Sequence, residues 1–391
     1  TLKAQAAKDY FLLVGPPGTG KTSRALRGMV EAFYREGKQI LLLSYTNRAV
    51  DEICKTLSAI TPEIDFIRIG SELSCDIPFR SHLMENVLES CSSRREVHAC
   101  IERCRVFVGT ISTFSSKTEL FRLKTFDVAI VDEATQILEP QLLGLLCARD
   151  VAGNNAIGKF ILIGDHKQLP AVVLQSESQS EVCEECLQSI GLYNLKDSLF
   201  ERLYRTVSAD HSSPTTQRFY DMLCRQGRMN VEVAQFPNRA FYGGLLEAVG
   251  LPHQQGKLVL APGLESDEFA DILVHRVAFL PSVPETPSQS AKINHFEARL
   301  TARLAASVYR QYEASNSGFN SALTLGVITR YRSQIALIKR EIAALGIPVL
   351  NDILVDTVER FQGSERDVII YSFCVNRTYQ LKFLANLTEE K

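Results

Sequence analysis

The stretch FLLVGPPGTGKTSRALRGM, residues 11 to 29, decides the fold of the first part of this chain. A short apolar run leads into a glycine-rich segment, and a helical pattern follows. This order is typical of a phosphate-binding loop, in which glycines let backbone N–H groups approach phosphate oxygens at a helix N-terminus. We expect Lys21 to reach the β- and γ-phosphates and the Thr22 hydroxyl to ligate Mg²⁺. The other residues predicted to bind ATP here are Gly15, Pro16, Pro17, Gly18, Thr19 and Gly20.

The composition indicates a globular protein. The chain has 391 residues, of which 45% are hydrophobic and 23% charged, enough for two or three domains with cores. No apolar run approaches the roughly eighteen residues of a membrane span. The net charge of −2 means that a polyanion would have to bind in local grooves. Ten cysteines without a complete zinc-ligand set predict a reducing compartment, the cytoplasm or, in a eukaryote, the nucleus.

Short apolar runs alternate with helical stretches in both halves of the chain. Such runs, bounded by glycine or polar residues, predict buried parallel strands and an α/β fold. We expect one domain over 1–207, with a helical insertion at about 70–105, and a second over 208–391, which begins with a polar linker at 208–216. The expected strands are Phe11–Val14, Ile40–Ser44, Val106–Gly109, Asp127–Val131 and Phe160–Ile163, then Lys257–Leu260, Ile272–His275, Leu323–Thr329, Ile353–Val355 and Val368–Phe373.

Two carboxylates end one of these strands. The segment FDVAIVDEATQ, residues 126 to 136, runs from a buried strand into Asp132 and Glu133. The carboxyl end of that strand is expected to lie beside the phosphate loop. Asp132 then suits a Mg²⁺ ligand, directly or through water, and Glu133 suits the base that orients and deprotonates the attacking water.

A further segment, FILIGDHKQLPAVV at residues 160 to 173, separates two classes of ATPase. Its Gln168 amide can bond both the γ-phosphate and the attacking water, and so can sense hydrolysis. Ring-forming ATPases usually carry Asn or Thr at this strand and use an arginine from a neighbouring subunit. The segment therefore favours a different class.

With these segments in order, the chain resembles the superfamily 1B helicases, in particular the nonsense-mediated-decay RNA helicase and the replication helicase–nuclease groups. The resemblance extends from Phe11 to about Arg377 and implies two tandem RecA-like domains of the P-loop NTPase fold with parallel sheets. Beyond the segments above it rests on SYTNRAVDEI (44–53), VGTIST (108–113), SLFERL (198–203), RQGRMN (225–230), FPNRAFYGGLL (236–246), GVITRYRSQ (326–334) and DTVERFQGSERDVII (356–370).

The resemblance implies roles for several further residues. Arg228 would point from the second domain to the γ-phosphate, where a planar guanidinium grips phosphate oxygens bidentately. Gly363 and Glu365 would approach the ribose. Gly227 stands where the family usually has Tyr, so the residue that stacks on adenine stays undefined.

The same resemblance places small polar side chains along a strand of nucleic acid. Hydroxyls and amides at strand ends can bond phosphates without reading bases, and an arginine and a tyrosine can add charge and a stacking face. For each threonine, capping of a helix is an equally good explanation of the residue type. The residues predicted to contact nucleic acid are Thr46, Asn47, Thr110, Ser112, Thr329, Tyr331, Arg332 and Thr357.

The sequence thus predicts an ATP-dependent motor that uses ATP and Mg²⁺ to move as a monomer along single-stranded DNA or RNA, in the family's habitual 5′ to 3′ direction. A translocase that remodels complexes without separating duplexes, and a nucleotide-gated binding module, are the alternatives; Glu133 argues against the second. The family's further block resembling VALTRAR and its glutamine ahead of the phosphate loop have no counterpart here. We therefore expect a core fragment, truncated at both ends and weak in hydrolysis.

Overall fold

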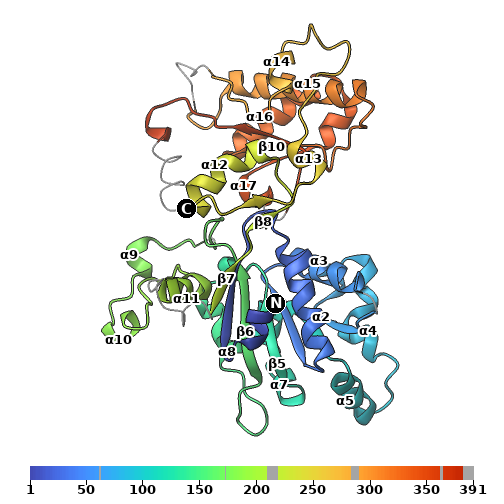
Figure 1. Cartoon of the computed structure of the whole chain (residues 1–391), viewed down its shortest axis with the longest axis vertical. Coiled ribbons are helices and arrows are strands. Elements are labelled where there is room, and N and C mark those ends of the chain that lie inside the picture. Colours follow the sequence, from blue (N-terminus) through green and yellow to red (C-terminus); the bar gives the residue numbers. More distant parts are fainter. Residues whose placement is uncertain (61–62, 172, 209–218, 283–289, 362–363, 382–391) are drawn as a thin grey trace. The chain divides into compact units, whose positions relative to one another are not determined.

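The computed structural model describes residues 1–391 except 61–62, 172, 209–218, 283–289, 362–363 and 382–391. The chain forms two compact units, one comprising Thr1–Met229 and Phe241–Val249, the other Asn230–Ala240 and Gly250–Lys391. Both units combine a parallel sheet with packed helices (Figure 1), so the predicted α/β architecture of two RecA-like domains is confirmed. Among the described residues, no helix is both long and apolar enough to cross a membrane.

A parallel sheet forms the centre of the first unit. Its seven strands among the described residues lie in the order β3-β4-β2-β5-β6-β1-β7, and every pairing is parallel. The carboxyl ends of all these strands consequently meet at one edge, where a ligand site is expected in such sheets. The strands are β1 (Tyr10–Val14), β2 (Ile40–Ser44), β3 (Phe66–Ile69), β4 (Val106–Thr110), β5 (Phe126–Val131), β6 (Ile157–Gly164) and β7 (Tyr220–Met222).

Helices cover both faces of this sheet, which explains why its strands are apolar throughout. Leu12 and Val14 of β1 belong to the core on one face, whereas Phe11 and Leu13 belong to the core on the other. The second face packs against α1 (Leu2–Ala6), α2 (Arg27–Arg35) and α3 (Asn47–Ser58). The first face packs against α5 (Arg94–Arg103), α6 (Ile111–Ser116), α7 (Leu120–Leu123), α8 (Glu139–Leu146) and α11 (Leu199–Ser208).

The expected insertion is helical, and a buried ion pair anchors its start. After β3, a strand that was not expected, the chain forms η2 (Glu72–Ser74), η3 (Ile77–His82), α4 (Met84–Leu88) and α5. Arg68 of β3 is fully buried, pairs with Asp51 of α3 and donates to the Ser74 carbonyl oxygen at 2.9 Å. The guanidinium thus joins β3, α3 and the first turn of the insertion.

The first unit extends further along the chain than residue 207. β7 pairs with β1, and the Leu223 amide donates to the Val14 carbonyl oxygen at 2.9 Å. The next strand, β8 (Arg225–Gln226), pairs with β9 (Glu247–Ala248) in the same unit. Backbone pairing therefore carries the chain past the expected boundary to Met229. Residues 209–216 of the expected linker lie outside the described residues.

The second unit has a smaller sheet, in the order β11 (Leu354–Asp356), β10 (Leu325–Thr329) and β12 (Val368–Ser372). Alanines of α15 (His295–Ala314) and Leu337, Ile338 and Ile342 of α16 (Arg332–Ala343) pack with β10 and β11 in its core. The other elements are α12 (Val231–Tyr242), which ends in the first unit, α13 (Pro252–Gln255), α14 (Ala270–Leu273), η6 (Pro348–Asp352) and α17 (Val358–Phe361).

Two of the expected strands in this half are wrong. Lys257–Leu260 has no regular structure and leaves Val259 75% exposed, and Ile272–His275 overlaps the helix α14. Short apolar runs do not distinguish strand from helix, and neither run gains a neighbouring strand among the described residues.

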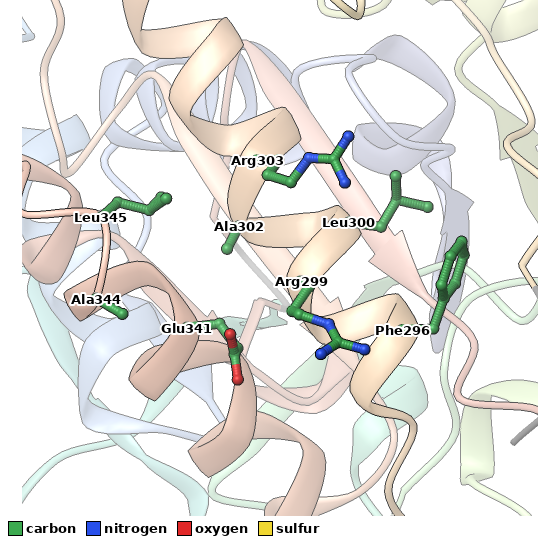
Figure 2. Close-up of a pocket in the computed structure, with 8 residues that line it drawn as sticks. All are labelled: Phe296, Arg299, Leu300, Ala302, Arg303, Glu341, Ala344 and Leu345. Atoms are coloured by element: carbon green, nitrogen blue, oxygen red, sulfur yellow. The ribbon is translucent and has the colours of Figure 1, made fainter.

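A pocket on this unit lies in the helical layer. Figure 2 shows residues that line it, which include Phe296, Arg299 and Arg303 of α15, Glu341 of α16, and Leu345. All of these except Leu345 belong to the two helices that pack on the sheet, and none of the residues predicted to bind nucleotide or nucleic acid lines this pocket.

Candidate nucleotide and nucleic-acid sites

The phosphate loop depends on glycine at three positions. Gly18 and Gly20 have φ values of 74° and 77°, a left-handed conformation that glycine adopts without strain. A Cβ atom at Gly15 would lie 2.1 Å from the Lys21 Cγ, so no larger residue fits there. The Gly15 amide donates to the Gly164 carbonyl oxygen at 2.8 Å, which fixes the start of the loop on β6.

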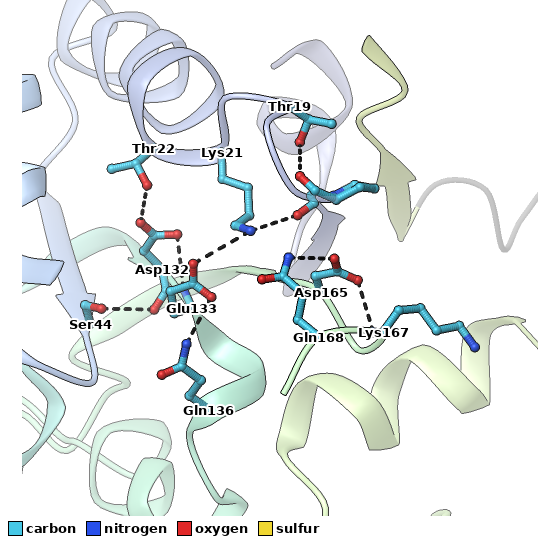
Figure 3. A network of polar contacts seen from close by, with 12 residues as sticks. Thr19, Lys21, Thr22, Ser44, Asp132, Glu133, Gln136, Asp165, Lys167 and Gln168 are labelled. Carbon is cyan, nitrogen blue, oxygen red and sulfur yellow. Dashed lines mark hydrogen bonds and ion pairs between the residues drawn. The ribbon is translucent and has the colours of Figure 1, made fainter. Parts of the chain in front are cut away.

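Lys21 lies between the loop and a carboxylate. Its Nζ donates to the Gly15 carbonyl oxygen at 2.9 Å and is 3.7 Å from the Glu133 Oε1 (Figure 3). Across the loop, the Thr19 hydroxyl donates to the Pro16 carbonyl oxygen at 2.7 Å. The Lys21 ammonium therefore lies at the loop whose backbone amides would bind phosphate oxygens.

The helix after the loop begins with π-helical turns at Lys21–Leu26, in which the Ala25 amide donates to the Gly20 carbonyl oxygen at 3.0 Å. Such segments are rare and often occur at functional sites. Its second residue, Thr22, donates through Oγ1 to the Asp132 Oδ2 at 2.7 Å. The hydroxyl at the start of the helix and the carboxylate at the end of β5 therefore meet.

Asp132 is buried, with 2% of its surface exposed, and its Oδ1 accepts from the Glu133 amide at 3.0 Å. Burial and the neighbouring Glu133 raise the pKa of this carboxyl to about 6. A hydroxyl and a carboxylate are hard oxygen ligands, which fit Mg²⁺. Among the described residues, no cluster of three His, Cys, Asp or Glu could hold a metal ion.

Glu133 adopts a backbone conformation that is uncommon for its residue type. Its φ is 52°, in the left-handed region, and such strain is concentrated at functional sites. The Gln136 Nε2 donates to the Glu133 Oε2 at 3.3 Å. The side chain keeps 26% of its surface exposed, so water can reach the carboxylate.

Gln168 is held by an aspartate of the same loop. Its Nε2 donates to the Asp165 Oδ2 at 2.7 Å, and its backbone amide donates to the Asp165 carbonyl oxygen at 3.0 Å. Asp165 directly follows β6, the neighbour of both β1 and β5 in the sheet. The structure thus places the predicted residues Lys21, Thr22, Asp132, Glu133 and Gln168 at the carboxyl ends of three adjacent strands.

Arg228 is not located as expected. Its segment belongs to the first unit, because the Gly227 amide donates to the Gly18 carbonyl oxygen at 2.8 Å. A Cβ atom at Gly18 would lie only 2.5 Å from the Arg228 Cβ. Arg228 therefore lies against the phosphate loop within the first unit, which corrects its assignment to the second. Glu365 is exposed, and Gly363 lies outside the described residues.

The predicted nucleic-acid residues of the first unit lie at the ends of two paired strands, β2 and β4. Thr46 caps α3 by accepting from the Ala49 amide at 3.2 Å, and Thr110 caps α6 by accepting from the Thr113 amide at 3.2 Å. A capping hydroxyl can still donate its proton. Asn47 and Ser112, the neighbouring residues, are exposed.

The residues of the second unit that are predicted to contact nucleic acid lie at the ends of β10 and β11. Thr329 is fully buried, and its hydroxyl makes no hydrogen bond to the described part of the chain. Tyr331 and the exposed Arg332 begin α16, and the Tyr331 hydroxyl oxygen lies 3.5 Å from the Gln380 Nε2. Thr357 directly follows β11, where its amide donates to the Asp356 Oδ1 at 2.8 Å.

Comparison with known proteins places the chain in a family. A family model described as AAA domain matches residues 195–388, and another of the same description matches 1–95 and 80–176. The DNA replication ATP-dependent helicase/nuclease DNA2 of Xenopus laevis is 30% identical over 390 residues, which cover 94% of this chain and 32% of that protein. This chain belongs to the superfamily 1B helicases.

Other relatives of this helicase chain carry similar names. The helicase/nuclease JHS1 of Arabidopsis thaliana is 29% identical, with 96% of this chain and 25% of that protein covered. The chain thus spans about a quarter to a third of the length of these relatives. A solved arterivirus nonstructural protein 10 (helicase) in complex with DNA matches 93% of this chain and 63% of that one at 14% identity and a TM-score of 0.38, a likeness too low to support an argument.

Three residues that bond the predicted site residues were not themselves predicted. The Ser44 hydroxyl donates to the Asp132 carbonyl oxygen at 3.3 Å, Gln136 bonds Glu133, and Asp165 bonds Gln168. All three stand within the segments quoted above, one to three residues from a predicted site residue or at the end of a strand. Residue type alone did not indicate that these side chains contact the site residues, and the hydrogen bonds in the structure do.

Proposed function

We propose that this chain hydrolyses ATP to move along single-stranded nucleic acid and to separate or remodel it. The observation that carries the proposal is the convergence of Lys21, Thr22, Asp132, Glu133 and Gln168 at the carboxyl edge of one sheet. A cation, a pair of metal-binding oxygens, a carboxylate and an amide are the groups that hydrolysis of a γ-phosphate requires.

In the proposed mechanism each group has a separate task. Lys21 binds the β- and γ-phosphates, which compete for its Nζ with the Gly15 carbonyl and Glu133. Thr22 and Asp132 would hold Mg²⁺, which supplies charge stabilisation at the phosphates when bound. Glu133 accepts the proton of the attacking water, and Gln168 orients that water through its amide oxygen.

Arg228 offers a second cation at the γ-phosphate. Its backbone lies against Gly18, and a guanidinium there can meet charge that develops in the transition state. We assign this role to Arg228 from the first unit, where it lies beside the loop that binds the phosphates.

Nucleic acid would contact the first unit at the residues that end β2 and β4, and it would contact the second unit at the residues that begin α16. Their hydroxyl, amide and guanidinium groups can bond phosphate oxygens without reading bases, so affinity should depend on the phosphates. DNA is the favoured strand, because the relatives in Xenopus and Arabidopsis are named DNA replication helicase/nucleases. The 5′ to 3′ direction remains a proposal from the family.

The test is ATPase activity with single-stranded DNA or RNA of equal length, with Glu133→Gln as the background control. We expect turnover that rises on addition of DNA and rises less with RNA. A chain that binds ATP but does not hydrolyse it with either strand is instead a nucleotide-gated binding module. Stimulated turnover without separation of a duplex identifies a translocase.

A further inference from the structure

A tyrosine from a distant helix bonds the aspartate that holds Gln168. The Tyr242 hydroxyl donates to the Asp165 Oδ2 at 2.7 Å, across 77 residues of sequence. Tyr242 is the last residue of α12 and belongs to the first unit, as does Asp165. Both side chains are buried, with 7% and 1% of their surface exposed. Burial and the neighbouring Asp165 raise the pKa of Tyr242, so its hydroxyl stays protonated and donates.

Asp165 has its orientation set by three donors. Its Oδ2 accepts from the Tyr242 hydroxyl and from the Gln168 Nε2, both at 2.7 Å, and its Oδ1 accepts from the Lys167 amide at 3.1 Å. Donors on both oxygens leave the carboxylate plane little freedom to rotate. A buried carboxylate that loses one of these donors would reorient or admit water.

The orientation of Asp165 in turn determines that of the Gln168 amide. A carboxylate only accepts hydrogen bonds, so the amide nitrogen must face Asp165 and the amide oxygen must face away. One N–H remains for a phosphate oxygen, and the oxygen remains for a water proton. A rotated amide would present the wrong atom to each.

We propose that Tyr242 is a positioning residue for hydrolysis, which fixes the Gln168 amide through Asp165. The inference rests on the proposed role of Gln168 in ATP hydrolysis. It also gives a function to the end of α12. The segment before this helix bonds the phosphate loop through Gly227 and Gly18, and its last residue bonds the loop that carries Gln168. Both contacts lie within the first unit.

The experiment is a double-mutant cycle with Tyr242→Phe and Gln168→Ala in the whole chain, in which kcat and KM for ATP are measured. Removal of the hydroxyl should lower kcat about tenfold or more and change KM less than twofold, because misorientation affects the chemical step. If Tyr242 acts through Gln168, Tyr242→Phe should have little further effect in the Gln168→Ala background. Full additivity, or an unchanged kcat, would overturn the inference. Tyr34→Phe, which removes a phenol hydroxyl from α2, is the matched control.

A second measurement does not depend on turnover. Hydrogen exchange of the Lys167 and Gln168 amides, without nucleotide, should be faster in Tyr242→Phe, while the amides of β1 keep their protection. Unchanged exchange at these two amides would overturn the positioning role. Wild-type protein that fails to hydrolyse ATP would overturn the proposed function, and hydrogen exchange alone would then decide whether Tyr242 holds this loop.

Discussion

The Thr22 hydroxyl donates to the Asp132 carboxylate at 2.7 Å, and this contact joins two segments that are 110 residues apart in the sequence. One oxygen stands at the start of the helix after the phosphate loop, and the other directly follows β5. The same two oxygens are those proposed to hold Mg²⁺. The hydrogen bond therefore brings the proposed metal ligands together within the protein itself.

Replacement of Thr22 by Val should reduce both stability and activity. Val keeps the shape of the side chain but removes a donor from a buried carboxylate, at a cost of about 1–3 kcal/mol in the free energy of unfolding. We also expect a higher Mg²⁺ concentration for half-maximal hydrolysis. Thr22→Ser retains the hydroxyl and should stay close to wild type in urea unfolding and in Mg²⁺ titration. If Thr22→Val and Thr22→Ser required the same Mg²⁺ concentration for half-maximal hydrolysis, the hydroxyl would not be a metal ligand.

Replacement of Glu133 by Gln should remove the base and little else. Gln136 can still donate to the new side chain, so the local structure should persist. Hydrolysis should fall on the order of 10²-fold or more, with ATP affinity unchanged. Single-turnover kinetics and nucleotide titration separate the two effects. Glu119→Gln, at an exposed position, is the control. Unchanged turnover in Glu133→Gln would remove this residue from the mechanism.

Lys21→Ala should act on nucleotide binding itself. The ammonium is the cation of the phosphate loop, and its loss removes attraction to the β- and γ-phosphates. We expect weaker binding of ATP in a fluorescence titration, with a smaller loss for AMP, which lacks both phosphates. Lys38→Ala removes a charge from a surface ion pair with Asp127 and should bind ATP normally. Equal affinity of Lys21→Ala and wild type for ATP would contradict the assignment.

The ion pair between Arg68 and Asp51 predicts a stability effect outside the nucleotide site. Arg68 is fully buried, so Asp51→Leu leaves a buried guanidinium without its carboxylate. Breaking such a pair costs about 3–5 kcal/mol, whereas an apolar replacement of both partners is often tolerated. Asp51→Leu should therefore destabilise the chain more than Arg68→Met with Asp51→Leu. Urea unfolding measures the difference, and a double variant less stable than the single one would contradict this expectation.

Affinity for single strands should fall as salt concentration rises, because phosphate contacts release counterions. Scrambling the base sequence should change affinity little. Arg332→Ala should weaken binding for all sequences alike and reduce the salt slope by about one unit or less. Fluorescence anisotropy at several salt concentrations measures both quantities. A strong preference for one base sequence, insensitive to salt, would indicate a specific binding module in place of a motor.

Local patterns in the sequence were sufficient where a residue's neighbours in the chain determine its structure. The phosphate loop, the five central strands of the first unit's sheet and the helical insertion follow from apolar runs, glycine and helical spacing within about twenty residues. The errors at Lys257–Leu260 and Ile272–His275 have the opposite origin. An apolar run becomes a strand only when a neighbouring strand pairs with it, and that partner lies elsewhere in the chain.

The sequence alone predicted the chemistry proposed for this chain, because a phosphate loop, an acidic pair and a loop glutamine can be recognised by residue type and order. Folding determined which of those groups meet and which other groups hold them. The position of Arg228 beside Gly18, the Thr22–Asp132 contact and the Tyr242–Asp165 bond join residues far apart in the sequence. Hydrogen bonds act over about 3 Å, and residues so distant come that close only through the packing of strands and helices.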